Sequence, residues 1–355
     1  MRPPARPALS LLAVLAAATL LAACAPVTIS ATLFADKARL MEVEVDRDKA
    51  PAGKIVLIDI RGLIADRSPS PLLGPGYNPV DELTARLRKA RDDRDIRAVI
   101  LRINSPGGTV TASDMVYREV RRFADESGKP VVASLGEVAA SGGYYLALAG
   151  DRIVAEPSSI TGSIGVIIPT LNISEGLERI GIRSRALVSG ENKDVANPLE
   201  RPREGHYALL QAMVDEFHLA FRQLVVARRA DALARASGAA PGGAIPESRL
   251  NQLTDGRIFT GRQAMDAGLV DAVGGVHESF GVAKELAGLK GARLVKYYRQ
   301  DADIPRSAYA PTAAAAAPGS TEINFIQIRA ESLGAQGGLE SAGAYYLWLA
   351  SGAGP

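Results

Sequence analysis

The sequence is short of the residues that build metal centres and disulfide frameworks. It has one cysteine, Cys24, and three histidines among 355 residues. A single cysteine excludes a disulfide framework and any zinc or iron–sulfur site that needs several cysteines. The histidines are His206, His218 and His277, too few to predict a histidine-rich metal site. We therefore expect no metal.

A strong net charge is also missing. Lysine and arginine number 41, aspartate and glutamate 39, and the net charge is +2. This balance does not indicate the clustered basic surface of a nucleic-acid-binding protein, so no nucleic-acid partner is expected. Hydrophobic residues make up 47% and charged residues 23%, close to the average of soluble globular proteins. Those fractions argue against disorder and against a polytopic membrane protein.

Residues 1–23 have the pattern of an export signal. Arg2 and Arg6 precede an almost uninterrupted apolar run from Ala8 to Ala23. As a helix this run rises about 24 Å, less than the roughly 30 Å of a bilayer's hydrocarbon core, so a signal peptide fits better than a permanent span. The following Cys24 ends a stretch that resembles the bacterial lipobox, whose cysteine is diacylated before cleavage. The alternative is a short uncleaved anchor; either one tethers the remaining chain to a membrane outside the cytoplasm.

Between residues 53 and 290, strands and helices alternate. Short apolar runs predict strands, and helical spacing predicts the segments between them. The expected strands are Lys54–Ile60, Arg97–Ile103, Pro130–Leu135 and Arg152–Ala155, and the expected helices are Val80–Arg91, Ser113–Asp125 and Val138–Ala149. Such alternation implies right-handed βαβ crossovers and a largely parallel sheet in an α/β domain.

The segments around this domain have less pattern. Residues 24–52 are expected to be a polar lead-in, and residues 291–355 a C-terminal extension that is partly linker-like and ends in an apolar stretch. Within the domain, His206–Arg229 is predicted to be a long amphipathic helix. Its apolar stripe belongs either to the core or to an interface between subunits, and consists of Leu210, Val214, Phe217, Phe221 and Leu224.

Three glycine-containing turns follow predicted strands, where ligands usually bind in open α/β sheets. The first is Ser105–Gly108, whose paired glycines can leave backbone amides free to stabilise an oxyanion, or can simply form a tight turn. The second begins at Ser141, 36 residues later, and the third is Thr161–Val166. Ser141 can be a nucleophile or a helix N-cap. If the first two strands are parallel neighbours, both turns lie at one end of the sheet.

A serine nucleophile needs a base. None of the three histidines falls in a loop of this type, which disfavours a Ser-His-Asp triad. A lysine can serve when burial lowers its pKa towards roughly 7–8. The candidate is Lys193, in a polar loop after an expected strand over Arg183–Val188, although a lone loop lysine is usually just solvated.

These motifs together resemble the S49 serine peptidases, the signal peptide peptidase A family of the ClpP/crotonase superfamily. The resemblance runs from about Lys54 to Leu286 and includes the sequences INSPGG, ASGGYYLA, TGSIGV, SGENKD and GRIFTGRQAMDAGLVDAVGG. Each motif is weak alone, but the five follow in family order. Each occurs once, as in the short form of the family. The resemblance implies a ClpP/crotonase-like fold with repeated ββα and βαβ units, and no metal or organic cofactor.

The resemblance also implies roles for particular residues. Ser141 would be the nucleophile and Lys193 the general base, with Ser163 hydrogen-bonded to the lysine amine. The amides of Gly108 and Gly142 would form the oxyanion hole. Around Lys193 the loop departs mildly from the family, which often has another basic or aromatic residue at positions 191 and 192.

The expected function is that of a membrane-tethered serine endopeptidase in the bacterial cell envelope, facing the extracytoplasmic side. Its substrates would be cleaved signal peptides and other extended apolar peptides. The short form implies a homo-oligomeric ring in which Ser141 and Lys193 come from adjacent protomers. The alternatives are a crotonase-like acyl-CoA enzyme, which would need neither residue, and a catalytically inert membrane scaffold on the same fold.

Overall fold

The computed structural model describes residues 39–67, 78–240, 242–300, 302–312 and 345–347. The expected signal sequence and Cys24 lie outside the described residues. Within them, no helix combines the length and the apolar character needed to cross a membrane.

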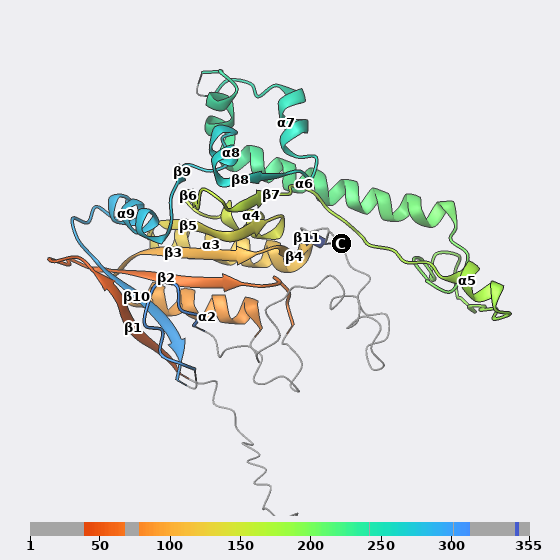
Figure 1. Cartoon of the computed structure of the whole chain (residues 1–355), viewed down its shortest axis with the longest axis horizontal. Coiled ribbons are helices and arrows are strands. Elements are labelled where there is room, and N and C mark those ends of the chain that lie inside the picture. The colour runs from red at the N-terminus through yellow and green to blue at the C-terminus, as the bar shows by residue number, and fades with distance from the viewer. Residues whose placement is uncertain (1–38, 68–77, 241, 301, 313–344, 348–355) are drawn as a thin grey trace, which may run out of the picture. The chain divides into compact units, whose positions relative to one another are not determined.

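A single large sheet organises the chain (Figure 1). Its central strands pair in parallel, in the order β10, β2, β3, β5, β6, β9, while β1 at one edge pairs antiparallel with β10. β7 adds in parallel to β5, and β8 pairs antiparallel with β7. The predicted α/β class with a largely parallel sheet is confirmed. The strands are β1 (Leu40–Arg47), β2 (Lys54–Arg61), β3 (Ile96–Ser105), β5 (Val131–Ala140), β6 (Arg152–Ala155), β7 (Ile160–Gly162), β8 (Ile258–Thr260), β9 (Ala272–Val273) and β10 (Arg293–Arg299).

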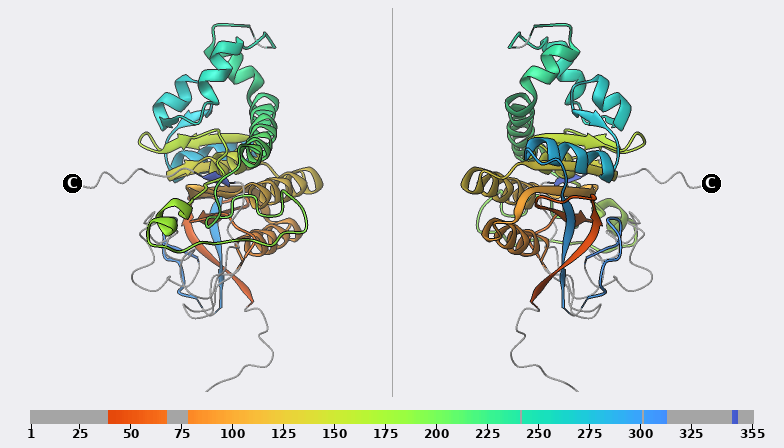
Figure 2. Two further views of the ribbon diagram at one scale, coloured as in Figure 1. Left: turned by 90° about the vertical axis from the view of Figure 1, so that its right-hand side faces the viewer. Right: turned by 90° about the vertical axis from the view of Figure 1, so that its left-hand side faces the viewer.

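Helices cover both faces of the sheet, so the central strands are apolar on both sides. Val56 and Ile58 of β2 pack into a core shared with α2 (Pro79–Asp92), α3 (Val110–Ser127) and α4 (Gly142–Ala147), whereas Ile55 and Leu57 pack with α9 (Val276–Leu286). Figure 2 shows α2 and α3 together on one face. Each such buried side chain contributes about 1.5–3 kcal/mol relative to an exposed one.

The remaining helices are α5 (Ser174–Arg179), α6 (Glu204–Ala236), α7 (Glu247–Leu253) and α8 (Gly261–Asp266). Residues 168–220, which include α5 and the first half of α6, extend away from the sheet; we call them the arm (Figure 1). The second half of α6 packs on the domain, where Phe221 and Val225 are fully buried. The long predicted helix is therefore present, but only part of its stripe is core.

Three expectations about local structure need correction. The expected helix Val138–Ala149 is in part strand, because β5 continues to Ala140, where it pairs with β7. The expected strand Arg183–Val188 does not form: among the described residues, no strand lies beside this segment of the arm. Conversely, the lead-in contains β1, which pairs with β10; apolar and acidic residues alternate over residues 41–46, a strand pattern that the expected polar lead-in overlooks. The sheet thus extends beyond residues 53–290 at both ends.

Candidate active site

The three glycine-containing turns meet at the carboxyl ends of adjacent parallel strands. In the β3–β5 pair Ser105 lies opposite Ala139, and in the β5–β7 pair Ala140 lies opposite Gly162. The prediction that the first two turns share one end of the sheet is confirmed, and the third turn joins them. The sheet register therefore gathers these residues without any need for the arm.

Ser141 stands at the sharp turn between β5 and α4. Its backbone has φ 52° and ψ −114°, a region that a non-glycine residue occupies only under constraint. Two 2.8 Å hydrogen bonds hold it there: its N–H donates to the Gly162 carbonyl, and its own carbonyl accepts from the Tyr145 N–H. The side chain does not cap the helix, and the buried Oγ has no hydrogen-bond partner among the described residues. The N-cap interpretation of this hydroxyl is wrong.

The first turn lies close to Gly142, the residue after Ser141. A Cβ on Gly142 would lie 3.0 Å from the Gly108 nitrogen and 2.5 Å from the Ser113 Oγ. Gly108 has still less room, since a Cβ there would lie 1.8 Å from the Ile64 carbonyl oxygen. Both positions therefore require glycine. The result is that the Gly108 amide lies directly beside the residue that follows Ser141, as two donors of an oxyanion hole must.

Ser163 lies next to the same turn. Its backbone φ is 50°, and its N–H donates to the Arg257 carbonyl at 2.8 Å. Gly162, immediately before it, accepts the Ser141 N–H, so the two serines are joined through one residue. Ser163 is buried. A buried hydroxyl at this place can orient a polar group that approaches Ser141.

Lys193 is elsewhere in the chain. It lies in the turn-rich loop between α5 and α6, and its side chain is exposed. In Figure 1 this part of the arm is well separated from α4 and β4 (Gly107–Thr109). The structure brings together Ser141, Ser163, Gly108 and Gly142, and it does not bring Lys193 to them within one chain.

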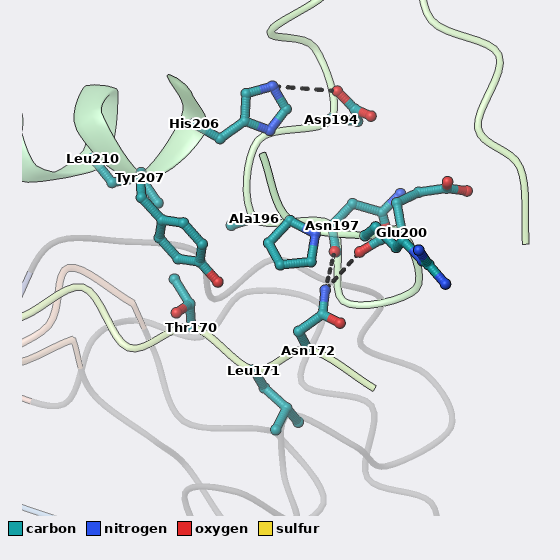
Figure 3. A pocket seen from close by; sticks show the side chains of 12 residues that line it. Thr170, Leu171, Asn172, Asp194, Ala196, Asn197, Glu200, His206, Tyr207 and Leu210 are labelled. Carbon is teal, nitrogen blue, oxygen red and sulfur yellow. Dashed lines mark hydrogen bonds and ion pairs between the residues drawn. The ribbon is translucent and has the colours of Figure 1, made fainter. Parts of the chain in front are cut away.

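The loop that carries Lys193 is nonetheless held in place by its neighbours. Figure 3 shows the small pocket formed there by residues 170–172, 194–197 and the start of α6. His206 Nε2 lies 3.0 Å from the Glu191 carbonyl and 3.8 Å from the Asp194 carboxylate, which also pairs with Arg203. The lysine is thus presented to solvent from a braced loop.

Two tyrosines of the second motif fix α4 beneath Ser141. The Tyr144 hydroxyl donates to the Leu269 carbonyl at 2.7 Å, and burial raises the pKa of Tyr144, which keeps the phenol protonated as a donor. The centroid of the Tyr145 ring lies 5.5 Å from that of Tyr117 and 5.0 Å from that of Phe221. The Tyr144 bond ties the serine motif to Leu269, within the GRIFTGRQAMDAGLVDAVGG motif.

Three residues of this region were not predicted as part of it. Ile64 accepts the Thr109 N–H at 3.0 Å and donates to the Gly107 carbonyl at 2.8 Å, which holds the first turn open. Ser113 is fully buried on α3, and its hydroxyl has no partner among the described residues. His206 braces the lysine loop. None lies in a recognisable motif, and only the tertiary contacts identify them.

The described residues contain no group of three or more His, Cys, Asp or Glu side chains arranged to hold a metal ion.

Two family profiles and several curated relatives match the chain. The sequence profile of peptidase family S49 matches residues 124–290, and that of Clp protease matches residues 78–161. The chloroplastic serine protease SPPA of Arabidopsis thaliana is 34% identical over 71% of this chain, which spans 36% of that longer relative. An Enterococcus faecium protein provisionally named signal peptide peptidase SppA is 33% identical over 69% of this chain and 67% of its own length. The chain belongs to peptidase family S49.

Proposed function

We propose that this protein is a serine endopeptidase in which Ser141 is the nucleophile. One observation carries the proposal: the Ser141 hydroxyl is buried on a constrained turn and caps nothing, and the next residue, Gly142, lies against the Gly108 amide. A serine that served only folding would use its hydroxyl in a hydrogen bond. Membership of a peptidase family points to the same chemistry.

In this proposal Ser141 Oγ attacks the carbonyl carbon of a peptide bond. The carbonyl oxygen becomes an oxyanion, which the amides of Gly108 and Gly142 stabilise. Lys193, as a neutral amine, takes the serine proton and then gives it to the leaving amine. Ser163 is a positioning residue whose hydroxyl forms a hydrogen bond with that amine. Water then hydrolyses the acyl-enzyme by the reverse sequence.

Lys193 would come from a neighbouring copy of the chain. The arm that presents it is rich in exposed apolar side chains, which a monomer seldom leaves in such number. Leu187 is 89% exposed and Ile180 71%, and others line the same arm: Leu171, Ile173, Ile182, Val188, Tyr207, Leu209, Met213 and Leu219. A ring of subunits would cover this surface and would place each lysine loop against the next protomer's Ser141.

The substrates we propose are extended apolar peptides, including cleaved signal peptides. A site at a strand edge pairs best with an extended backbone. We further propose that Cys24 is lipidated and holds the protein at the extracytoplasmic face of a membrane. Cys24→Ala should then block maturation, and intact-mass measurement would show a chain that retains Met1 and lacks acyl groups.

Labelling with a fluorophosphonate probe tests the nucleophile. The purified full chain should label at Ser141, and Ser141→Ala should not label, while Ser113→Ala serves as a matched control that keeps its label. An acyl-CoA enzyme or an inert scaffold would not react. Absence of labelling in a folded, oligomeric preparation would overturn the proposal.

A further inference from the structure

The last described strand of the chain lies in the candidate active site. β11 (Tyr345–Leu347) pairs antiparallel with β4, the strand of the first turn (Figure 1). On its other side, Tyr345 exchanges backbone hydrogen bonds with Ile167 in both directions, each of 3.0 Å. β11 also contacts α4, the helix that begins after Ser141. An extended piece of the chain thus fills the space between two backbone edges that flank the serine.

The hydrogen bonds of β4 show which of its backbone groups face this strand. The Gly107 carbonyl and the Thr109 N–H are both bonded to Ile64, on the side away from β11. Backbone groups alternate in direction along a strand, so those of Gly108 point towards β11. The Gly108 amide is the one we assign to the oxyanion hole.

The register then places one residue of the tail at that amide. Tyr346 lies opposite Gly108. Since Tyr345 uses its backbone groups on Ile167, alternation turns those of Tyr346 towards β4. A substrate whose carbonyl is to be attacked by Ser141 needs the same position, so the tail and the substrate compete for one amide.

The beginning of the C-terminal extension is fixed near the same end of the sheet. The fully buried Lys296 pairs with Asp59 at 2.6 Å and donates to the carbonyls of residues 308 and 310, at 3.0 and 2.7 Å. Arg61, the last residue of β2, donates to the Tyr309 carbonyl at 2.8 Å. Residues 308–310 therefore lie against β10 and the end of β2, while residues 345–347 pair with β4.

We propose that the C-terminal segment around residues 345–347 is a built-in peptide ligand of the active-site cleft, bound as an added strand and displaced by the substrate. The inference rests on the proposed function for the identity of the cleft. Strand addition takes its affinity from backbone hydrogen bonds, and a tethered ligand acts at an effective concentration of about millimolar. The tail therefore acts as a competitive inhibitor.

The test is a pair of substitutions at one position of the full chain. Tyr345→Pro removes the N–H that bonds Ile167, and Tyr345→Phe keeps it. With a short fluorogenic apolar peptide, Tyr345→Pro should lower the apparent KM by about fivefold or more at unchanged kcat, the behaviour of a lost intramolecular competitor. Tyr345→Phe should behave as the natural chain. A synthetic peptide of residues 340–351 should restore the high KM, and the same peptide with the Tyr345→Pro change should not. An unchanged KM in Tyr345→Pro would overturn the inference.

A binding measurement separates this inference from the proposed function. In a Ser141→Ala background, the fluorescent peptide of residues 340–351 should bind the Tyr345→Pro chain more tightly than the chain with its natural tail. If that binding is seen but no form hydrolyses peptides or reacts with a fluorophosphonate, the proposed function fails and the tail ligand stands. If hydrolysis is present but the peptide binds both chains equally, the tail ligand fails alone.

Discussion

The carboxyl edge of the sheet and the arm differ in how well the side chains of a single chain are buried. At the edge, Ser141, Gly142 and Ser163 are buried, and the two serines donate their backbone N–H groups to carbonyls of neighbouring segments. On the arm, Lys193 is exposed and the apolar side chains around it have little to cover them. The comparison teaches that a single chain builds the turn of the proposed nucleophile, whereas the proposed base lies on a surface that, in our proposal, another subunit covers.

The largest expected effect comes from a substitution of Lys193 on the arm. Lys193→Arg should lower kcat by about a thousandfold or more, since a guanidinium stays charged at any usable pH and cannot take a proton. For the natural chain, kcat/KM should rise with pH, because only the neutral amine acts as a base. The melting temperature should not change in Lys193→Arg, an exposed site. Peptide assays on matched oligomers measure kcat and the pH dependence of kcat/KM. Near-normal turnover in Lys193→Arg would eliminate Lys193 as the base.

The next largest effect is expected from a substitution at the carboxyl edge of the sheet. Gly142→Ala puts a Cβ 2.5 Å from the Ser113 Oγ and 3.0 Å from the Gly108 nitrogen, so the paired amides must move apart. The loss of one oxyanion donor typically lowers kcat by about 10²–10³-fold. Gly176→Ala, on the arm, has nothing within 4 Å of its Cβ and is the matched control. Equal kcat values in the two variants would contradict the oxyanion assignment.

A smaller loss is expected at Ser163. Ser163→Ala keeps the nucleophile and the amides and removes only the hydroxyl that orients the amine, so kcat should fall by about tenfold, the scale of one hydrogen bond. Its kcat–pH profile should shift relative to the natural chain. A profile that does not move would assign Ser163 a purely structural role.

The smallest effect on catalysis is expected at Tyr144. Tyr144→Phe leaves the Leu269 carbonyl without its 2.7 Å donor, and the free energy of unfolding should fall by about 1–3 kcal/mol. Turnover by the folded enzyme should remain within about twofold, because the phenol contacts no reacting atom. Urea denaturation and a peptide assay measure the two quantities. A large loss of kcat without destabilisation would show that Tyr144 does more than anchor α4.

The sequence predicts the packed edge better than the arm for a physical reason. The signals for apolar strands and glycine turns lie in neighbouring residues. The sequence therefore predicts β3, β5 and β6 and the turns at Gly108 and Ser141. Segments that depend on distant partners are not predicted in this way. Arg183–Val188, expected as a strand, has no strand beside it among the described residues, and β11 lies in the site only through tertiary contacts.

Complementation between two inactive chains tests the central claim most directly. Ser141→Ala and Lys193→Ala chains would be co-expressed, and mixed oligomers purified through two different affinity tags and assayed against a fluorogenic peptide. Each parent alone should be inactive. If the base comes from the adjacent protomer, mixed oligomers should recover a substantial fraction of the natural activity wherever an intact Ser141 meets an intact Lys193 across an interface. Mixed oligomers that form but remain inactive would contradict the account and place both residues in one chain's site.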